Sequence, residues 1–165
     1  MSTTTSSCLM ALFILFGFSL GSCKKDTTKG CTNTNAINYS SEANEDDGSC
    51  EFERDKFLGI WNGQKDCMFN PLDTIISVEI GPTAENFNSI IINNFPDVGL
   101  SAVAIVNASS PREFTINSQD ITNDLDVYTL SGRGEVFLNT MVVNYYKTYD
   151  ISSIDTCGLG ITKME

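Results

Sequence analysis

The strongest constraint on the fold is an alternation of apolar and polar residues that runs from Asp55 to Glu165. Ile76, Val78 and Ile80 fall on one face of an extended segment, for example. A period of two places successive side chains on opposite faces of a β-strand, so the pattern predicts strands with one buried face. The strands expected are 57–67, 74–80, 88–95, 100–107, 112–118, 127–132, 135–146 and a last one over 160–163.

Short connections separate these segments. Proline, glycine, asparagine and aspartate mark them, at 70–71, 81–82, 96–97, 110–111 and 123–124. Most are too short for parallel crossovers, so we expect an antiparallel meander. Closing the meander into a barrel removes its unpaired edges. The sequence therefore predicts an all-β domain over residues 55–165, a small antiparallel meander or β-barrel.

An uncharged run of twelve residues extends from Leu9 to Leu20. It is too short to span a bilayer, which needs about 20 residues, and it has the length of a signal-peptide core. The tetrapeptide Leu20-Gly21-Ser22-Cys23 resembles the lipobox of bacterial lipoproteins. That resemblance implies a signal peptide over residues 1–22 and a lipid anchor, including acyl chains such as palmitate, on Cys23. The alternative is an ordinary secretory signal with Cys23 in a disulfide.

The lipid anchor sets an expected location. Residues 23–29 would form the anchor and tether, and acyl chains insert into a bilayer at about 0.8 kcal/mol per buried methylene. Lys24 follows the lipidated cysteine, which resembles lipoproteins sent to an outer membrane. We therefore expect a cell-envelope protein, anchored at the outer membrane and facing the periplasm or the cell surface.

Four of the six cysteines remain once Cys8 leaves with the signal peptide and Cys23 takes the lipid. They are Cys31, Cys50, Cys67 and Cys157. An even number in an exported chain predicts two disulfides. Three pairings are possible, and the positions favour Cys31–Cys50 and Cys67–Cys157, because each pair brackets one segment. The competing interpretation, a zinc site, is disfavoured by the absence of histidine and of any Cys-x-x-Cys pair.

Residues 30–54 begin with the run GCTNTNAINYSSEANEDDGSCEF. This run resembles a short extracellular repeat of surface proteins from Bacteroidetes-type bacteria. Ile37, Tyr39 and Phe52 are almost its only large apolar side chains. We therefore expect the disulfide to replace a hydrophobic core, and the segment to act as a spacer between membrane and barrel.

The same segment offers a candidate calcium site. Asn38, Asp46 and Asp47 carry oxygen atoms of the kind that calcium binds. The spacing does not fit an EF-hand, because aligning Gly48 with the loop glycine puts Ala43 at the first position. A polar turn closed by the disulfide is the favoured interpretation.

The motif Gly59-Ile60-Trp61 opens the main domain. It resembles the Gly-x-Trp motif of lipocalins, and FLGIWNGQKDC resembles the start of small lipocalin-like domains in Bacteroidetes lipoproteins. The resemblance implies a barrel that binds a small apolar ligand, and an arginine late in the chain, Arg133, stacked on Trp61. The competing expectation is an interior filled by side chains. Those side chains are Trp61, Ile76, Val78, Ile80, Ile92, Phe114, Phe137 and Met141.

The amino-acid composition excludes some classes of function. The chain has no histidine and a formal charge of -11, which excludes histidine-dependent nucleophile activation and disfavours binding of nucleic acid. Enzymatic chemistry would have to rest on carboxylates, which are taken as solvated surface groups. They are Asp120, Asp124, Asp126, Asp150 and Asp155.

We therefore expect a non-enzymatic, membrane-anchored lipoprotein without a cofactor. Its barrel would bind a small ligand or an envelope protein. The alternative is a structural or assembly lipoprotein with a filled barrel and a protein-binding outer face.

Overall fold

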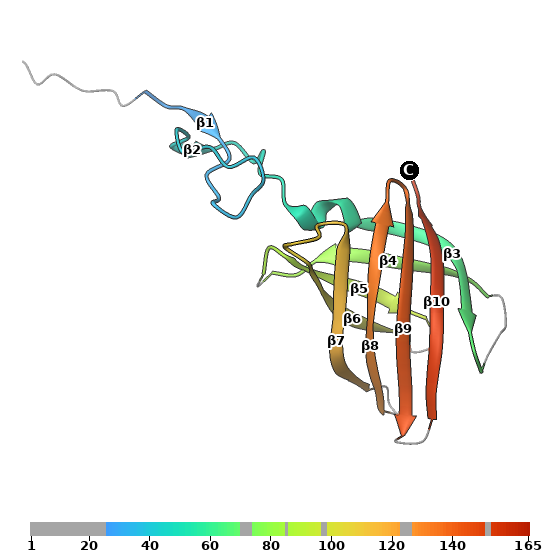
Figure 1. The fold of residues 1–165 in the computed structure, drawn as a ribbon. Helices are drawn as coiled ribbons and strands as arrows, with labels where there is room; N and C mark the ends of the chain where they lie inside the picture. Colours follow the sequence, from blue (N-terminus) through green and yellow to red (C-terminus); the bar gives the residue numbers. More distant parts are fainter. Residues whose placement is uncertain (1–25, 70–73, 85, 97–98, 123–126, 151–152) are drawn as a thin grey trace, which may run out of the picture.

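The computed structural model describes residues 26–69, 74–84, 86–96, 99–122, 127–150 and 153–165 (Figure 1). A small disulfide-closed segment precedes a β-barrel, and a short 3-10 helix, η1, joins them. The elements are β1 (Lys29–Gly30), β2 (Glu45–Asp46), η1 (Glu53–Phe57), β3 (Gly59–Cys67), β4 (Thr74–Pro82), β5 (Ser89–Phe95), β6 (Leu100–Val106), β7 (Glu113–Thr122), β8 (Val127–Phe137), β9 (Thr140–Asp150) and β10 (Ser153–Lys163).

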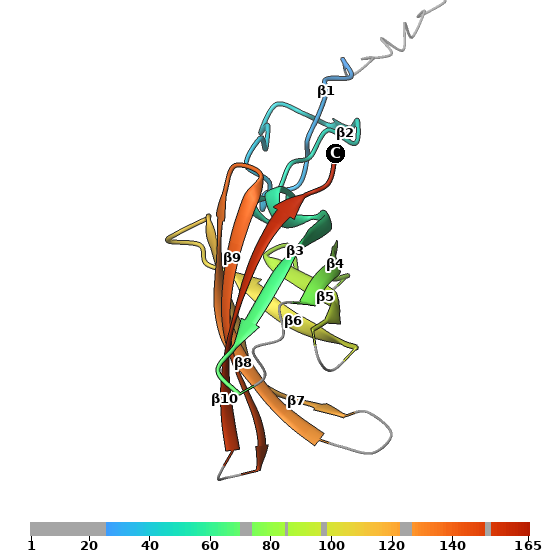
Figure 2. The same ribbon diagram turned by 90° about the vertical axis from the view of Figure 1, so that its right-hand side faces the viewer.

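The eight long strands form a closed antiparallel barrel in which each strand pairs with its neighbours in the chain. The last strand, β10, pairs with the first, β3, and so closes the sheet (Figure 2). Closure leaves no unpaired edge strand in the barrel. The predicted all-β fold and its antiparallel topology are confirmed.

The predicted alternation of apolar and polar residues decides which side chains point into the barrel. On β3 and β4, for example, Trp61 lies beside Val78, and both are buried. Two bulges shift the phase of the alternation. The first lies in β5 between Ile92 and Phe95, and the second in β7 between Ile116 and Gln119. They bring Phe95 and Ile121 to the interior, where a strict period of two would have put their neighbours.

The C-terminal part of the barrel differs from the prediction. The expected strand 135–146 is wrong, because β8 ends at Phe137 and a two-residue turn, Leu138-Asn139, leads into β9. This turn reverses the phase of the alternation, so Phe137 points outward and is 46% exposed, and its assignment to the core is wrong. The short expected strands 127–132 and 160–163 are parts of β8 and β10.

The remaining expected core residues are placed as predicted. Trp61, Val78, Ile80, Ile92, Phe114 and Met141 are buried, and Ile76 packs partly buried against them. The start of the domain was predicted as strand from residue 57, whereas η1 runs to Phe57 and the strand begins at Gly59.

Strands β6 and β7 pair over only two positions, Ile105 with Thr115 and Val106 with Phe114. Beyond them a side chain takes the place of a backbone partner. The Gln119 side chain accepts a hydrogen bond from the Val103 amide nitrogen at 3.0 Å and donates one to the Val103 carbonyl oxygen at 2.7 Å. Gln119 therefore continues the ladder where the β7 bulge carries the backbone away.

One end of the barrel is closed by η1, and we call it the capped end. Phe57 packs edge-on against Phe114, with ring centroids 5.5 Å apart, and accepts a hydrogen bond at its carbonyl from Trp61 Nε1 at 2.8 Å. Gly134 makes room for the Phe114 ring, since a Cβ there would lie 2.1 Å from it. Met141 and Ile161 complete this apolar end.

Candidate functional site

The interior changes character toward the other end of the barrel, where β3 and β9 finish and β10 begins. Lys65 on β3, Lys147 on β9 and Asp155 on β10 are 3%, 3% and 6% exposed. These three neighbouring strands put them inside by the same alternation that buries their apolar neighbours. We call this region, together with the tyrosines and the disulfide described below, the charged end.

Lys147 and Asp155 are directly opposite each other in the register of β9 and β10. Side chains at such positions on one face have their Cβ atoms about 4.5–5.5 Å apart. Asp155 Oδ1 accepts a hydrogen bond from the Phe69 amide nitrogen at 3.2 Å. This bond fixes the carboxylate at the point where the chain leaves β3.

Aromatic rings surround the Lys147 ammonium. Its Nζ lies 4.8 Å from the centroid of the Tyr149 ring and 6.0 Å from that of Tyr128. The two rings meet edge to face, with centroids 4.9 Å apart. A cation held against tyrosine faces is attracted by the ring quadrupole, and this offsets part of the cost of its burial.

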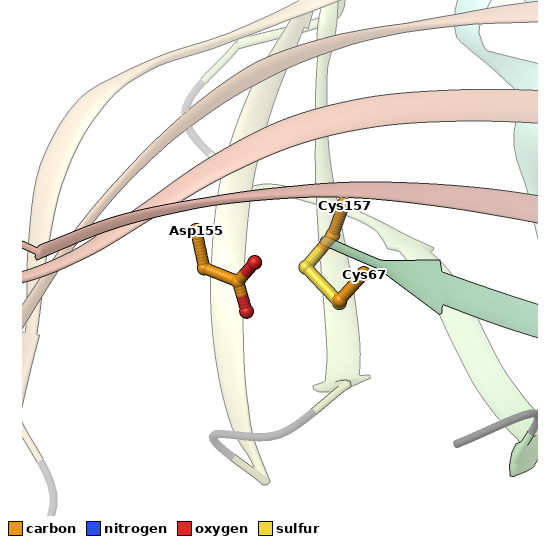
Figure 3. Close-up of side chains that lie close together, drawn as sticks. All are labelled: Cys67, Asp155 and Cys157. Carbon is orange, nitrogen blue, oxygen red and sulfur yellow. A yellow bond between two sulfur atoms is a disulfide. The ribbon is translucent and has the colours of Figure 1, made fainter. Parts of the chain in front are cut away.

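The disulfide Cys67–Cys157 lies in the same interior, next to Asp155 (Figure 3). The Tyr145 hydroxyl lies 3.8 Å from Cys67 Sγ, and the Tyr145 ring packs edge-on against Phe95. Among the described residues, Cys67, Asp155 and Cys157 are the one group of three side chains close enough to share a metal ion. Because both sulfurs are bonded to each other, neither is available as a thiolate ligand.

Burial of this many charges is costly. Removing an ammonium or a carboxylate from water costs several kcal/mol, and apolar residues of similar volume are often as stable or more stable in its place. Both lysines have interaction partners in the structure. The capped end, in contrast, is filled by apolar side chains, with Lys163 lying over the Trp61 ring at its boundary. Charged groups in an apolar interior occur at ligand sites.

Exposed apolar side chains lie at the strand ends on this side of the barrel. Met68 and Phe69 at the end of β3, Tyr149 near the end of β9 and Ile154 near the start of β10 are each at least half exposed. We call these four residues the mouth rim. They lie on the same three strands that carry the buried charges.

The predicted disulfides are confirmed: Cys31 is bonded to Cys50, and Cys67 to Cys157. The second bond joins β3 to β10 and so crosses the seam at which the barrel closes. Cys23 and the signal peptide lie outside the described residues, so the lipid anchor stays a prediction.

The Gly-x-Trp motif has a structural role at the capped end. Gly59 has φ of +123°, and a Cβ there would lie 3.2 Å from the Lys163 side chain. The prediction that Arg133 stacks on Trp61 is wrong, because Arg133 is exposed on the outer face of β8 between two inward positions. The cation over the indole is Lys163, whose Nζ lies 5.6 Å from the ring centroid.

The three candidate calcium ligands hold the polar turn together. Asn38 donates to the Ser49 carbonyl at 2.5 Å and accepts from the Glu51 amide nitrogen at 2.9 Å. Asp46 accepts from the Gly48 amide nitrogen at 2.9 Å, and Asp47 from that of Ser49 at 3.0 Å. Hydrogen bonds from Ser49 lower the pKa of Asp47 below its ordinary value. These contacts are the ones a turn needs, as the favoured interpretation predicted.

The candidate carboxylates are not brought together where the structure describes them. Asp120 is exposed and accepts a hydrogen bond from the Thr129 hydroxyl at 2.7 Å, whereas Asp155 is buried inside the barrel. Describing Asp155 as a solvated surface group was therefore wrong. Asp124 and Asp126, and the side chain of Asp150, lie outside the described part of the chain.

Lys65 and Lys147 were missed by the sequence analysis, although the signal for them was present. Counting in steps of two from Trp61 leads to Lys65 and Cys67 on the buried face, and counting from Met141 leads to Lys147. A lysine at an inward position was passed over because lysine is almost never fully buried unless it is paired.

The disulfide-closed segment is attached to the barrel by a specific joint. The Phe52 and Phe87 rings stack with centroids 4.8 Å apart, and the Arg54 guanidinium lies 5.6 Å and 5.8 Å from them. Arg54 Nη1 also donates to two main-chain carbonyls of the β4–β5 connection and to that of Ser89 at the start of β5, at 2.7 to 3.3 Å. The segment therefore leaves the barrel from the capped end, beside the C-terminus, and the charged end lies opposite (Figures 1 and 2).

No helix in the described part of the chain is long and apolar enough to cross a bilayer. We compared the chain with protein-family models, with curated proteins and with solved structures, and none of the three comparisons found a match.

Proposed function

We propose that the chain is a lipid-anchored lipoprotein of the cell envelope whose barrel binds a small ligand at the charged end without catalysis. The observation that carries the proposal is the burial of Lys65, Lys147 and Asp155 inside a barrel whose other end is apolar. Buried charges are costly, and charged groups in an apolar interior occur at ligand sites. The lipobox resemblance at Cys23 and the lipocalin resemblance at Gly59 and Trp61 point the same way.

The joint at Arg54 gives the proposal an orientation. Cys23 precedes the first described residue, Asp26, by three positions, and three extended residues span at most about 11 Å. An acylated Cys23 would therefore hold the membrane near the disulfide-closed segment, on the side of the capped end. The charged end and its mouth rim then face away from that membrane.

The assignment to a binding protein fits the carboxylates that the structure describes. A pair of carboxylates can hydrolyse a glycosidic bond only when both face one cleft. Asp120 and Asp155 lie on opposite faces of the barrel wall.

A second candidate function is the docking of an envelope protein on the outer face. A shallow groove of about 790 Å³ crosses this face over β7 to β10, lined by Arg133, Asn144, Tyr146 and Thr156 among others. An exposed tyrosine among hydrogen-bonding side chains suits a protein contact. In that case the charged end would be a structural feature alone.

Native mass spectrometry of the full chain, expressed in a bacterial host and isolated from membranes, tests the proposal. We expect a released mass beyond the acylated polypeptide, and we expect Lys147→Met to reduce its occupancy. Arg133→Met is the matched control, because it removes a cation from the outer groove and leaves the interior intact. A ligand lost in Arg133→Met and kept in Lys147→Met would favour the outer face instead.

A further inference from the structure

We propose that the tip of the β8–β9 hairpin contacts the surface of the lipid bilayer in which the chain is anchored. The contact is made by four exposed apolar residues at the capped end. They are Ile60, Phe137, Leu138 and Met164, and we call them the hairpin patch. This inference rests on the lipid anchor of the proposed function, and it does not depend on what the charged end binds.

Leu138 is the most unusual residue of the hairpin patch. It is 96% exposed, the largest exposed fraction among the large hydrophobic side chains that the structure describes. It occupies the first position of the two-residue turn and has a φ of +55°. A hairpin turn with a positive φ at that position favours glycine, because the Cβ of any other residue crowds the backbone. Leu138 is therefore neither the residue type that the turn prefers nor a residue that packs into the barrel, and such an outlier points to a role outside the fold.

The other three residues of the patch lie beside this turn. Phe137 ends β8, and Met164 follows β10. Lys163 N donates a hydrogen bond to the Asn139 carbonyl oxygen at 2.8 Å, and Met164 N donates one to the Ile60 carbonyl oxygen at 2.9 Å. These two bonds hold the end of β10 between the turn and β3. The three apolar side chains are each about half exposed, so with the turn they form a cluster at one margin of the barrel. Single exposed apolar residues are ordinary, whereas a cluster marks a contact surface.

The position of the disulfide-closed segment favours a bilayer as the partner. Arg54 fixes that segment at the capped end. Asp26, the first described residue, lies three positions after Cys23, so an acylated Cys23 would lie within about 11 Å of it. The segment, the β8–β9 turn and the C-terminus all lie on this side of the barrel (Figures 1 and 2). The hairpin patch is therefore on the side where the anchor would hold the membrane.

The surroundings of the patch suit the boundary between acyl chains and headgroups. The outward row of side chains that contains Phe137 continues across the neighbouring strands as Thr140, Thr162 and Asn62. Apolar side chains backed by hydroxyl and amide groups match a surface whose apolar face enters the headgroup boundary by about 5–10 Å. Glu165 follows Met164 and carries a charge, so we expect Leu138 to reach deepest.

The test places a fluorescent reporter at the tip. Leu138→Trp is compared with Ile75→Trp, which puts the same side chain at an exposed apolar position of β4. Both full-length chains are isolated from bacterial membranes and reconstituted in vesicles of phospholipids brominated on their acyl chains. The buried Trp61 is present in both, and its emission is subtracted with the parent chain. We expect the brominated lipid to quench the Leu138→Trp emission at least threefold more strongly than that of Ile75→Trp, and aqueous iodide to quench them in the opposite order.

A second pair of variants separates the leucine side chain from the turn. Leu138→Asn removes the apolar side chain and keeps a residue type that tolerates a positive φ. In a Phe137→Trp chain, adding Leu138→Asn should lower the quenching by brominated lipid by at least half, whereas adding Ile75→Asn should leave it unchanged. The thermal unfolding midpoint of Leu138→Asn should equal or exceed that of the parent chain. A lower midpoint with unchanged quenching would assign Leu138 to the stability of the hairpin.

Mass spectrometry of the same samples reports the acylation of Cys23 and so distinguishes the two proposals. Acylated chains whose Leu138→Trp emission is not quenched by lipid would overturn the inference and leave the proposed function standing. An emission shielded from both quenchers, with a dimer in sedimentation, would assign the patch to a second copy and overturn the inference as well. Unacylated chains that lipid still quenches would support the contact and remove the anchor, and unacylated chains without quenching would remove both.

Discussion

The two ends of this barrel are built on the same strands by the same alternation, yet they hold opposite kinds of side chain. On β9, Met141 at the capped end and Lys147 at the charged end lie six residues apart on one face, and both are buried. On β3, Trp61 and Lys65 repeat the contrast. Burial alone therefore does not decide the residue type at an inward position. The inward positions at the capped end are apolar, whereas those at the charged end include charged residues.

The ends also differ in how they are closed. At the capped end, η1 covers the interior, and Lys163 lies over Trp61 as a lid on the last apolar layer. At the charged end, the Cys67–Cys157 disulfide fastens the seam between β3 and β10, and exposed apolar residues lie at the strand ends. The capped end has the features of a structural core, and the charged end is the one proposed above to bind a ligand.

The largest effect is expected from moving a charge to the wrong end. Met141→Lys places an ammonium in the apolar layer, where its burial costs several kcal/mol, a large part of a domain stability of about 5–15 kcal/mol. We expect loss of the cooperative unfolding transition followed by circular dichroism. Met141→Leu, which conserves volume, should unfold like the parent chain. A folded, stable Met141→Lys would show that the two ends are equivalent.

The next largest effect is expected at the seam. Replacing Cys67 and Cys157 together by serine should lower the free energy of unfolding by about 2–5 kcal/mol, because the cross-link no longer restricts the unfolded chain. Denaturant titration of the barrel transition measures it. The paired control, Cys31→Ser with Cys50→Ser, removes the other disulfide and should leave that transition within about 0.5 kcal/mol.

Exchange in the opposite direction should be tolerated. Lys147→Met combined with Asp155→Asn removes both charges of the facing pair and keeps the acceptor for the Phe69 amide nitrogen, and a buried charge pair is often replaced without loss of stability. We expect a change in unfolding free energy of less than about 1.5 kcal/mol, or an increase. A loss beyond about 3 kcal/mol would mean that the pair is required by the fold, and the contrast between the ends would lose its functional meaning.

The smallest effect is expected at the lid of the capped end. Lys163→Met removes the cation over the Trp61 ring and keeps the length of the side chain, so it should cost about 0.5–1 kcal/mol. The same variant should change the fluorescence of the single tryptophan. Arg133→Met, the residue first predicted to stack there, should change neither quantity. An effect of Arg133→Met on the tryptophan signal would contradict the observed position of Arg133.

Alternation and the turn residues were sufficient to predict the antiparallel barrel, and position along the chain was sufficient to pair the cysteines. They did not predict where β8 ends. The turn at Leu138-Asn139 contains neither glycine nor proline, Leu138 adopts a positive φ of 55° there, and the single Asn139 was a weak marker of the end of β8. Phe137 was placed in the core for that reason.

The charged end was missed for an energetic reason. Lys65 and Asp155 occupy inward positions that the pattern would have identified, but a general preference for exposed charge outweighed it. Lys163 took the place predicted for Arg133 because the inward face of β8 carries Gly132 and Gly134 on either side of Arg133, which turns the arginine outward. Both errors concern side chains whose direction depends on exact register.

The most direct test uses the aromatic residues as reporters of the two ends. The single tryptophan, Trp61, lies at the capped end, whereas Tyr128, Tyr145 and Tyr149 lie at the charged end. In an NMR titration of the full chain with octanoate, the ring resonances of those tyrosines should shift while the Trp61 indole N–H stays unchanged. A shift of the indole with silent tyrosine rings would contradict the assignment of the charged end as the binding site.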